Sequence, residues 1–383
     1  MGRFGHNEIV GTSTAGGQTV KRFAHIDFMR AVAVLMVLLQ HAGLEQGLLG
    51  SAGVTMFFVI SGFVITNQAL AEASVTGRFA IGNFYLRRAI KLLPPLIAVL
   101  VLPSLVLGLA SNWTKVNPSS LLSQVLFFYN SVRISGQQGV LPGTDVVWSL
   151  SVEEQFYIGF ALLWLLCLKL PKPRLALSCL AGLAIVCSTL LRLSLANTGN
   201  QELAQRIYFS TDTRIDAIAL GVLIAVFLRS NAWPALRNRV PSLIWDGLLF
   251  VCISVLSFSL LLGDYKANYS WLITVHALGS AGILILGFSG GAGLLIRGLA
   301  RLSSVSGLKT IGLASYSIYL VHHTVSLALS SMVVALPPLL GIVIKVLAGL
   351  AAGLLVWLAV ERPVERIKDQ RLKREWRGAA SVG

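Results

Sequence analysis

Charged residues are scarce in this sequence: they make up 12% of its 383 residues, while 55% of the residues are hydrophobic. A mean hydropathy of +0.76 is too high for a chain that folds in water, which excludes a water-soluble globular protein. The sequence instead has long apolar runs, each able to cross about 30 Å of hydrocarbon as a helix. The short alternating segments of a membrane β-barrel are missing. We therefore expect an all-α fold, a polytopic membrane helical bundle.

Cysteine and acidic residues are also few. The four cysteines lie inside apolar runs without metal-ligand spacing, so they predict packing residues and no metal site. Lysine and arginine outnumber aspartate and glutamate, 31 to 16, giving a net charge of +15. The basic residues are spread over short segments between apolar runs rather than gathered in a soluble basic domain. The charge therefore indicates membrane topology, and no nucleic acid partner is expected.

About ten transmembrane helices are predicted from the apolar runs. They lie near residues 28–46, 51–70, 84–110, 146–168, 174–195, 211–229, 242–263, 271–290, 310–333 and 338–360. The composition of the flanking segments predicts a disordered cytoplasmic tail at 1–22, a membrane domain at 23–363 and a basic cytoplasmic tail at 364–383. The segment 111–145 is then the longest external loop, with a re-entrant or interfacial piece near 119–130.

The basic residues also predict the orientation. With both termini in the cytoplasm, few of them lie outside the membrane or in the outer halves of helices. These are Lys115, Arg133, Arg192, Arg206, Arg214, Lys266 and Lys345. Because positive charge is retained on the cytoplasmic side, we expect a multi-pass protein of a bacterial inner (plasma) membrane with both ends inside.

Titratable residues within the apolar runs are costly, so each needs a partner or a function. Arg30 and His41, eleven residues apart, share one face of the first helix, with His41 in the outer half. Glu153 lies at a similar depth on another helix. If the two meet, the carboxylate would fix the imidazole tautomer and stabilise the imidazolium formed on proton uptake. The alternatives are a packing role for His41 and a structural ion pair between Asp27 and Arg30.

Further polar residues fall on predicted helix faces. Arg88 and Lys91, an i, i+3 pair near the cytoplasmic end of the third span, are either topological flanking charges or a clamp for the phosphates of an anionic cofactor. Tyr319 and His322 share a face near the middle of the membrane, and His323 is expected to be a spare histidine.

The fourth and sixth spans add a second group of polar positions. Ser149, Glu153 and Tyr157 form one stripe on the fourth span. Arg214 and Asp216 lie at the outer end of the sixth span, where they could hold a polar acceptor or form a helix-end ion pair.

Several motifs together resemble one family. They are Ile26 to Arg30 with Gln40-His41-Ala42, Gly53 to Phe63, Phe84 to Lys91, Trp148 to Tyr157, Ser315 to His322, and Glu361-Arg362-Pro363. In this order they resemble the acyltransferase-3 family of membrane O-acyltransferases over nearly the whole chain after residue 22. The Ser-x-Glu-x-x-Phe-Tyr element is carried by Ser151, Glu153, Phe156 and Tyr157. The family usually has Arg-x-x-Arg where this chain has Arg88 and Lys91, and the lysine keeps the charge but loses bidentate geometry.

The resemblance implies transfer of an acyl group, usually acetyl, from cytoplasmic acyl-CoA to a hydroxyl of an extracytoplasmic or lipid-linked glycan. It implies functional importance for Arg30, His41, Arg88 and Glu153. The combined prediction has His41 and Glu153 as catalytic residues and Arg30, Arg88 and Lys91 as binding residues for acetyl-CoA or another acyl-CoA. Substrate-binding or structural polar roles are predicted for Asp27, Ser151, Tyr157, Arg214, Asp216, Tyr319 and His322.

Two questions stay open at this point. His41 could act as a general base for direct attack on the thioester, which we prefer, or a residue such as His41 could carry the acyl group transiently. We expect no extra esterase-like domain of the kind that some relatives append, so the sequence resembles stand-alone exopolysaccharide or oligosaccharide O-acetyltransferases. The rival function is a proton-coupled secondary transporter, for which inverted repeats with broken helices would be evidence; the sequence shows none. Nothing in the sequence indicates an oligomeric state.

Overall fold

The computed structural model describes residues 13–15, 18–20, 23–44, 48–198, 200, 203–261, 270–290 and 293–367. Within these ranges helices form nearly all of the regular structure, which confirms the predicted all-α fold. The exception is a short antiparallel pair, β1 (Ser13–Ala15) and β2 (Gln18–Val20), inside the segment predicted as the N-terminal tail. Most of the predicted C-terminal tail lies outside the described residues.

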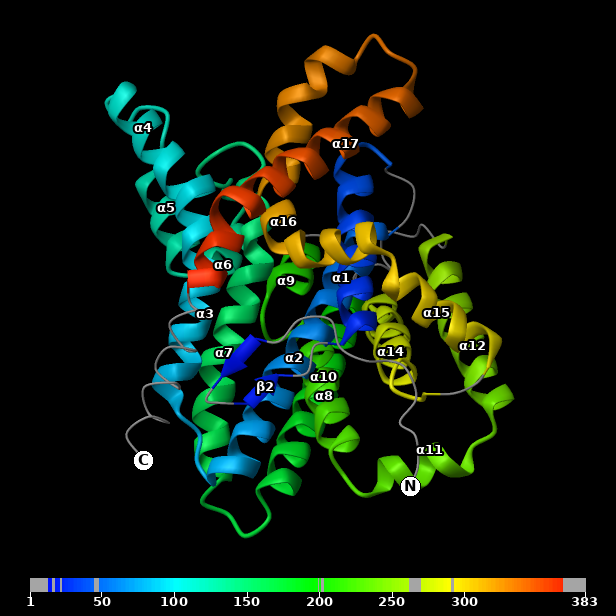
Figure 1. The fold of residues 1–383 in the computed structure, drawn as a ribbon. Helices are drawn as coiled ribbons and strands as arrows, with labels where there is room; N and C mark the ends of the chain where they lie inside the picture. The colour runs from blue at the N-terminus through cyan, green and yellow to red at the C-terminus, as the bar shows by residue number, and fades with distance from the viewer. Residues whose placement is uncertain are drawn as a thin grey trace.

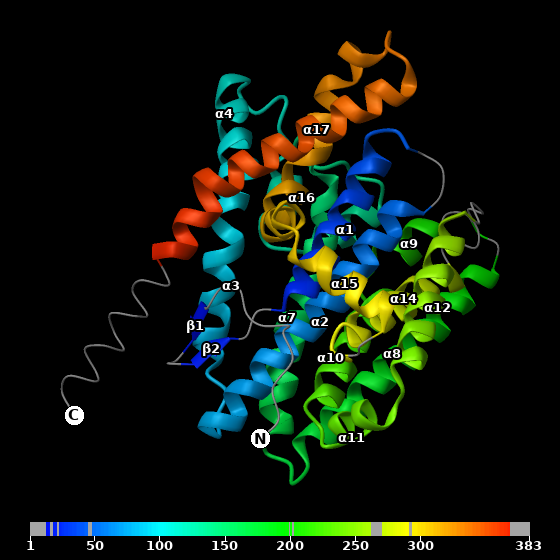
Figure 2. The same cartoon turned by 45° about the vertical axis from the view of Figure 1, so that its right-hand side comes forward.

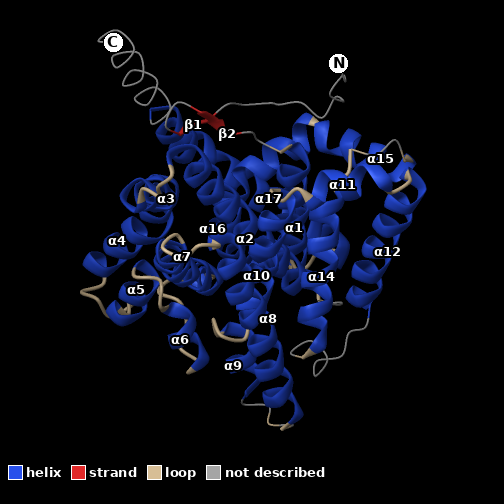
Figure 3. Ribbon diagram, turned by 90° about the horizontal axis from the view of Figure 1, so that it is seen from below, coloured by secondary structure: helices blue, strands red, loops and turns tan. Residues whose placement is uncertain are grey.

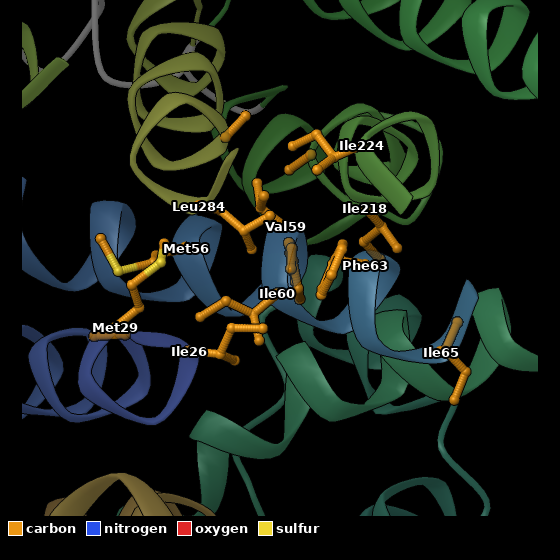
Figure 4. Close-up of a cluster of buried hydrophobic side chains, with 14 of the residues drawn as sticks. Ile26, Met29, Met56, Val59, Ile60, Phe63, Ile65, Ile218, Ile224 and Leu284 are labelled. Carbon is orange, nitrogen blue, oxygen red and sulfur yellow. The ribbon is translucent and has the colours of Figure 1, made fainter. Parts of the chain in front are cut away.

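Five helices build the centre of the bundle. They are α1 (Ala24–His41), α2 (Leu49–Thr76), α10 (Ile215–Leu228), α14 (Trp271–Leu286) and α16 (Ser306–Val333). In Figures 1 and 2, α2 runs between α1 and α10, and all three lie beside α14. The packing between them is apolar: Figure 4 shows Met29 of α1, Met56 and Phe63 of α2, Ile218 of α10 and Leu284 of α14 turned toward one another.

Glycines allow α2 and α10 to approach closely. A Cβ atom at Gly62 would run into the backbone carbonyl of Ile218, and one at Gly221 into the carbonyl of Val59. In a bilayer, lipid tails are as apolar as leucine, so helix association depends on such close van der Waals packing. The two glycines therefore fix the spacing of the central helix pair.

The remaining helices surround this centre. They are α3 (Ile81–Leu96), η1 (Ile97–Val101), α4 (Leu102–Ala110), α5 (Pro118–Val125), α6 (Tyr129–Ile134), η2 (Thr144–Val146), α7 (Val147–Cys167), α8 (Pro173–Asn197), α9 (Leu203–Phe209), α11 (Ala232–Arg239), α12 (Ser242–Leu261), α15 (Leu294–Ser304), α17 (Pro338–Val356) and η3 (Trp357–Glu361). Figure 3 shows α4, α5 and α6 at one edge and α12 and α15 at the opposite edge. Large apolar side chains such as Leu190, Phe250 and Leu347 are exposed on these outer helices, as expected of a surface that faces lipid.

Two prolines interrupt the third span. Pro94 and Pro95 lie inside α3, and the helix continues through the π-helical turn η1 into α4. Proline removes a backbone hydrogen bond and crowds the preceding turn, and a π-turn accommodates this without ending the helix. The predicted external segment 111–145 holds the short helices α5 and α6 rather than a span.

The number of spans is lower than predicted when length and apolarity are the criteria. Seven described helices are long and apolar enough to cross a membrane, or eight if α10 and α11, bent by 82° to each other, count as one. The predicted spans 271–290 and 310–333 correspond to α14, which has 16 residues, and to α16, which carries the serines, tyrosines and histidines of the candidate site. The chain is a multi-pass membrane protein.

Candidate active site

The end of α1 and the middle of α16 bring two histidines into contact. His41 is the last residue of α1, and its Nδ1 lies 3.0 Å from Nε2 of His322. His322 is buried, whereas His41 is partly exposed. Their rings have centroids 5.0 Å apart. The two helices pack along their length, so the pair belongs to the rigid centre of the bundle (Figure 1).

The hydrogen bonds of this pair assign its protons. His322 Nδ1 lies 2.7 Å from the backbone carbonyl of Tyr319, and because a carbonyl only accepts, Nδ1 carries the proton and Nε2 has the lone pair. His41 Nδ1 faces both that lone pair and the carbonyl of Val37 at 3.1 Å, so it must also donate. A neutral imidazole protonated at Nδ1 has its free lone pair on Nε2. The network therefore prepares His41 Nε2 to accept a proton.

His323 and Asp145 complete the surroundings of His41. The His323 ring lies 4.2 Å from the His41 ring, so the histidine expected to be spare packs directly against the candidate base. The Asp145 carboxylate is close enough for its charge to act on both rings. Its Oδ1 accepts from the Tyr129 hydroxyl at 2.6 Å and from the Gly139 amide at 2.9 Å.

Asp145 was missed by the sequence reasoning. It lies in η2, just before the fourth span, where an acidic residue looks like an ordinary loop residue. Burial and the hydrogen bond to Asp145 raise the pKa of Tyr129, so this phenol remains a donor to the carboxylate. A carboxylate so held can stabilise an imidazolium that forms at His41.

Glu153 is half-buried in α7 and does not bond to His41. Its Oε2 accepts from the Ser61 hydroxyl at 2.9 Å and from the Tyr157 hydroxyl at 3.0 Å. Among the described residues no hydrogen bond joins Glu153 to His41, so the direct contact that the sequence left open is not formed. The reason is rotation: Glu153 faces α2, whereas His41 faces α16, and a depth estimate from the sequence does not contain helix rotation.

The two groups are nevertheless linked through side chains. Ser149, one turn before Glu153, lies 2.7 Å from the hydroxyl of Tyr319, and Tyr319 precedes His322 by one turn. Tyr319 also donates to the carbonyl of Val146 at 3.1 Å. The hydrogen bond between Ser149 and Tyr319 therefore joins α7 to α16 at a point one turn from Glu153 and one turn from His322.

Arg88, one of the predicted cofactor-binding cations, is held by a carboxylate and an aromatic ring. Arg88 Nη2 is 3.1 Å from Glu154 Oε1, and its guanidinium lies 3.5 Å from the ring centroid of Tyr157. Its charge also acts on Glu153. Arg88 thus has carboxylate and aromatic partners already in place, which hold it next to the Glu153 site.

Arg30 and Lys91 form a separate group. Arg30 Nε donates to Ser315 Oγ at 3.1 Å. Both Arg30 and Lys91 lie near Glu361, whose Oε2 accepts from Ser317 at 2.6 Å. Four helices that are distant in sequence therefore meet at this point: α1, α3, α16 and η3.

Asp27 and Ser151 have less prominent positions. Asp27 is buried in the first turn of α1, where its backbone carbonyl lies against Gly312 of α16. The Ser151 hydroxyl donates to the Val147 carbonyl of its own helix at 3.3 Å. It takes no part in the hydrogen bond between Ser149 and Tyr319.

Arg214 and Asp216 do not form the helix-end ion pair that was one of the two interpretations of these residues. Asp216 pairs with Arg192 of α8 at 2.6 Å, and both side chains are buried. Arg214 Nη2 instead donates to Thr55 Oγ1 at 3.0 Å and lies among the rings of Phe58, Trp148 and Tyr208. Arg192 had been counted only as an outer basic residue; its position inside an apolar run was the available signal.

The donor set of the site suits proton transfer. No group of three or more His, Cys, Asp or Glu side chains among the described residues is placed to hold a metal ion. The site offers a base with an assigned lone pair at His41 and, three turns away on the same helix, the cation of Arg30.

Comparison with known proteins now identifies the family. A family model described as an acyltransferase domain, acyltransferase 3, matches residues 23–361. The chain belongs to the acyltransferase 3 family. The match covers every helix of the candidate site, from Arg30 and His41 on α1 to Glu361 on η3.

Curated relatives of this acyltransferase share about a quarter of its residues. O-acetyltransferase OatA of Staphylococcus aureus (strain NCTC 8325 / PS 47) is 26% identical over 333 residues, which is 80% of this chain and 51% of OatA. The Bacillus subtilis (strain 168) protein named "Putative peptidoglycan O-acetyltransferase YrhL" is 27% identical over 390 residues, 93% of this chain and 58% of YrhL. The chain thus spans about half the length of these relatives. No solved structure matches it.

Proposed function

We propose that this acyltransferase is a membrane O-acetyltransferase, which transfers an acetyl group from cytoplasmic acetyl-CoA to a hydroxyl of a cell-surface or lipid-linked glycan. Family membership supports acyl transfer, and the names of the relatives support acetyl as the group and a glycan as the acceptor. The observation that carries the proposal is the hydrogen bond between His41 and His322, because it leaves His41 Nε2 as an oriented base.

The reaction follows from that base. His41 Nε2 takes the proton of the acceptor hydroxyl while the oxygen attacks the thioester carbonyl carbon. The carbon–sulfur bond then breaks, and the thiolate of CoA takes the proton back from His41. The Val37 carbonyl and the His322 lone pair accept from Nδ1 throughout, and Asp145 offsets the charge of the transient imidazolium.

The donor would enter from the other end of the bundle. Arg30 lies about 16 Å from His41 along α1. Arg30, Lys91 of α3 and Arg88 of α3 would meet the phosphates of acetyl-CoA. With both termini in the cytoplasm, these cations face the cytosol and His41 faces outward. The extended arm of the coenzyme can bridge such a separation.

One experiment tests the function. Surface glycans are compared by mass spectrometry between cells lacking the gene and cells complemented with wild type, His41→Ala or the control Ser330→Ala, whose hydroxyl bonds only within α16. We expect O-acetyl groups to disappear on deletion and to return with wild type and Ser330→Ala but not with His41→Ala. Unchanged O-acetyl content on deletion would contradict the proposal.

A further inference from the structure

A second buried polar cluster lies at the ends of α2, α8, α10 and α14, outside the histidine pair. Of these four helices, α10 packs against the other three (Figure 1). The cluster contains Arg192, Arg214, Asp216 and His276, and all four side chains are at most 1% exposed. It is used by no step of the proposed reaction.

The charges in this cluster do not balance. Asp216 is taken by Arg192, whose guanidinium also donates to the backbone carbonyls of Thr213 and Ser270 and to the hydroxyl of Thr274. Arg214 bonds to one hydroxyl and lies against three aromatic rings, and it shares the charge of Asp216, whose Oδ1 has no hydrogen-bond partner among the described residues. Two guanidiniums therefore face one carboxylate among the described residues of the cluster. An uncompensated charge inside an apolar bundle is costly, which makes a missing anion the simplest completion.

Unsatisfied donors point to the same place. Among the described residues, Nε and Nη1 of Arg214 have no hydrogen-bond partner. Neither ring nitrogen of His276 has one, and nor does the Ser280 hydroxyl one turn later on the same face of α14. Arg214 and His276 are close enough for the charge of one to act on the other. Buried polar atoms are rarely left unpaired, so several at one point indicate a ligand that supplies acceptors.

The cluster adjoins the reaction centre. Trp148, which contacts Arg214, is followed by Ser149, and Ser149 bonds to Tyr319 one turn from His322. The side chains flanking Arg214 also include Tyr208, whose pKa is raised by burial, so the phenol stays neutral and adds no compensating charge. A group bound at Arg214 would therefore be part of a molecule that reaches toward His41.

We propose that Arg214 and His276 bind an anionic oxygen group, a carboxylate or a phosphate, of the acceptor glycan. The assignment to the acceptor rests on the proposed function, because Arg214 lies at the same end of the bundle as His41; the anion site itself rests only on charge and unpaired donors. Arg214 would supply a charge-assisted hydrogen bond, and His276 and Ser280 would donate or accept at the remaining oxygens.

The test measures binding without acetyl-CoA. Full-length protein in nanodiscs is titrated calorimetrically with glucuronate, glucose 1-phosphate and glucose, as wild type, Arg214→Gln, His276→Gln and the matched control Arg206→Gln. Arg206 is a surface residue paired with Asp212. We expect one of the two anionic sugars to bind about tenfold or more tightly than glucose, because hydrogen bonds to charged groups are stronger than neutral ones. Which of the two binds identifies carboxylate or phosphate.

The variants decide the assignment. Arg214→Gln should abolish the preference for the anionic sugar, His276→Gln should reduce it, and Arg206→Gln should retain it. Equal binding of all three sugars to wild type, or an undiminished preference in both Arg214→Gln and His276→Gln, would overturn the site. If Arg214→Gln does not fold, His276→Gln alone decides. If the wild-type protein binds the anionic sugar but transfers no acetyl group, the anion site is supported and only the proposed function is contradicted.

Discussion

Ser149 of α7 and Tyr319 of α16 share a 2.7 Å hydrogen bond, and both hydroxyls also lie within hydrogen-bond distance of the Val146 carbonyl. This contact joins the helix that carries Glu153 to the helix that carries His322. The position of Glu153 relative to His322 along the helix axes therefore depends on this hydrogen bond. A change at either hydroxyl should reach both ends of the site.

Removing the Tyr319 hydroxyl tests this coupling. Tyr319→Phe and Ser149→Ala should each lower kcat/KM by up to about tenfold, since a net hydrogen bond contributes about 1 kcal/mol. The double variant should cost less than the sum of the two single variants, because either change alone already breaks the bond. Strictly additive losses would mean that the two hydroxyls act independently.

Substitutions of His41 and of His322 should lower the activity by different amounts. His41→Ala should lower kcat by about 10²- to 10⁴-fold, the range for a lost general base. His322→Ala should cost less, because His322 orients His41 without touching the acceptor. His322→Gln, which can still accept from His41 Nδ1, should restore most activity and the wild-type pH profile of kcat/KM. A full loss in His322→Gln together with an unchanged profile in His322→Ala would contradict a positioning role.

Glu153 should be required although it does not contact His41. Glu153→Gln keeps the size of the side chain but removes the charge that faces Arg88, so we expect acetyl transfer to be lost while expression and membrane insertion remain intact. Glu72→Gln is the matched control, because Glu72 lies on α2 and pairs with Arg87 at the end of the bundle. Transfer of acetyl by purified Glu153→Gln at the wild-type rate would exclude the residue from the reaction.

The close approach of α2 and α10 should depend on glycine. Gly62→Val places branched carbon against the Ile218 carbonyl and should destabilise the bundle by about 1–3 kcal/mol, the range for overpacking. Gly182→Ala on α8 has open space around the new Cβ and should be neutral or slightly stabilising. Thermal midpoints from size-exclusion profiles of heated samples would compare the two. Equal midpoints would show that the helices can separate without cost.

The ion pair between Arg206 and Asp212 lies outside the membrane-spanning helices and should make the thermal stability depend on pH. Burial opposes ionisation of Asp212, but hydrogen bonds from Arg206 and Ser210 outweigh it and hold its pKa below the usual value. A carboxyl with a depressed pKa contributes stability above the pKa it has in the unfolded chain and loses it as the pH falls through the folded value. Wild type should therefore exceed Asp212→Asn slightly in thermal midpoint at neutral pH, and the difference should vanish in acid. It should be small, because the pair is partly exposed.

Much of the fold was predictable because the hydrocarbon of the membrane restricts the backbone to helices in long apolar runs. In hydrocarbon every backbone amide and carbonyl must be paired, so apolar runs of this length have to become helices. Their positions therefore followed from composition, apart from α14 and α16, where length and polar content lowered the count of spans. The residue types of the site were also visible, since His41, Glu153, Arg88 and Arg214 are costly in an apolar run unless they have a role.

Which of these side chains meet was decided only by the tertiary structure. The sequence predicted one membrane depth for His41 and Glu153. In the structure the rotation of α1 and α7 about their axes makes His41 bond to His322, and Glu153 bond to Ser61 and Tyr157. In the same way Asp216 pairs with Arg192 rather than with its neighbour Arg214. Spacing along a chain fixes which residues share a helix face, whereas partners across helices depend on how the helices pack, and that is a property of the whole bundle.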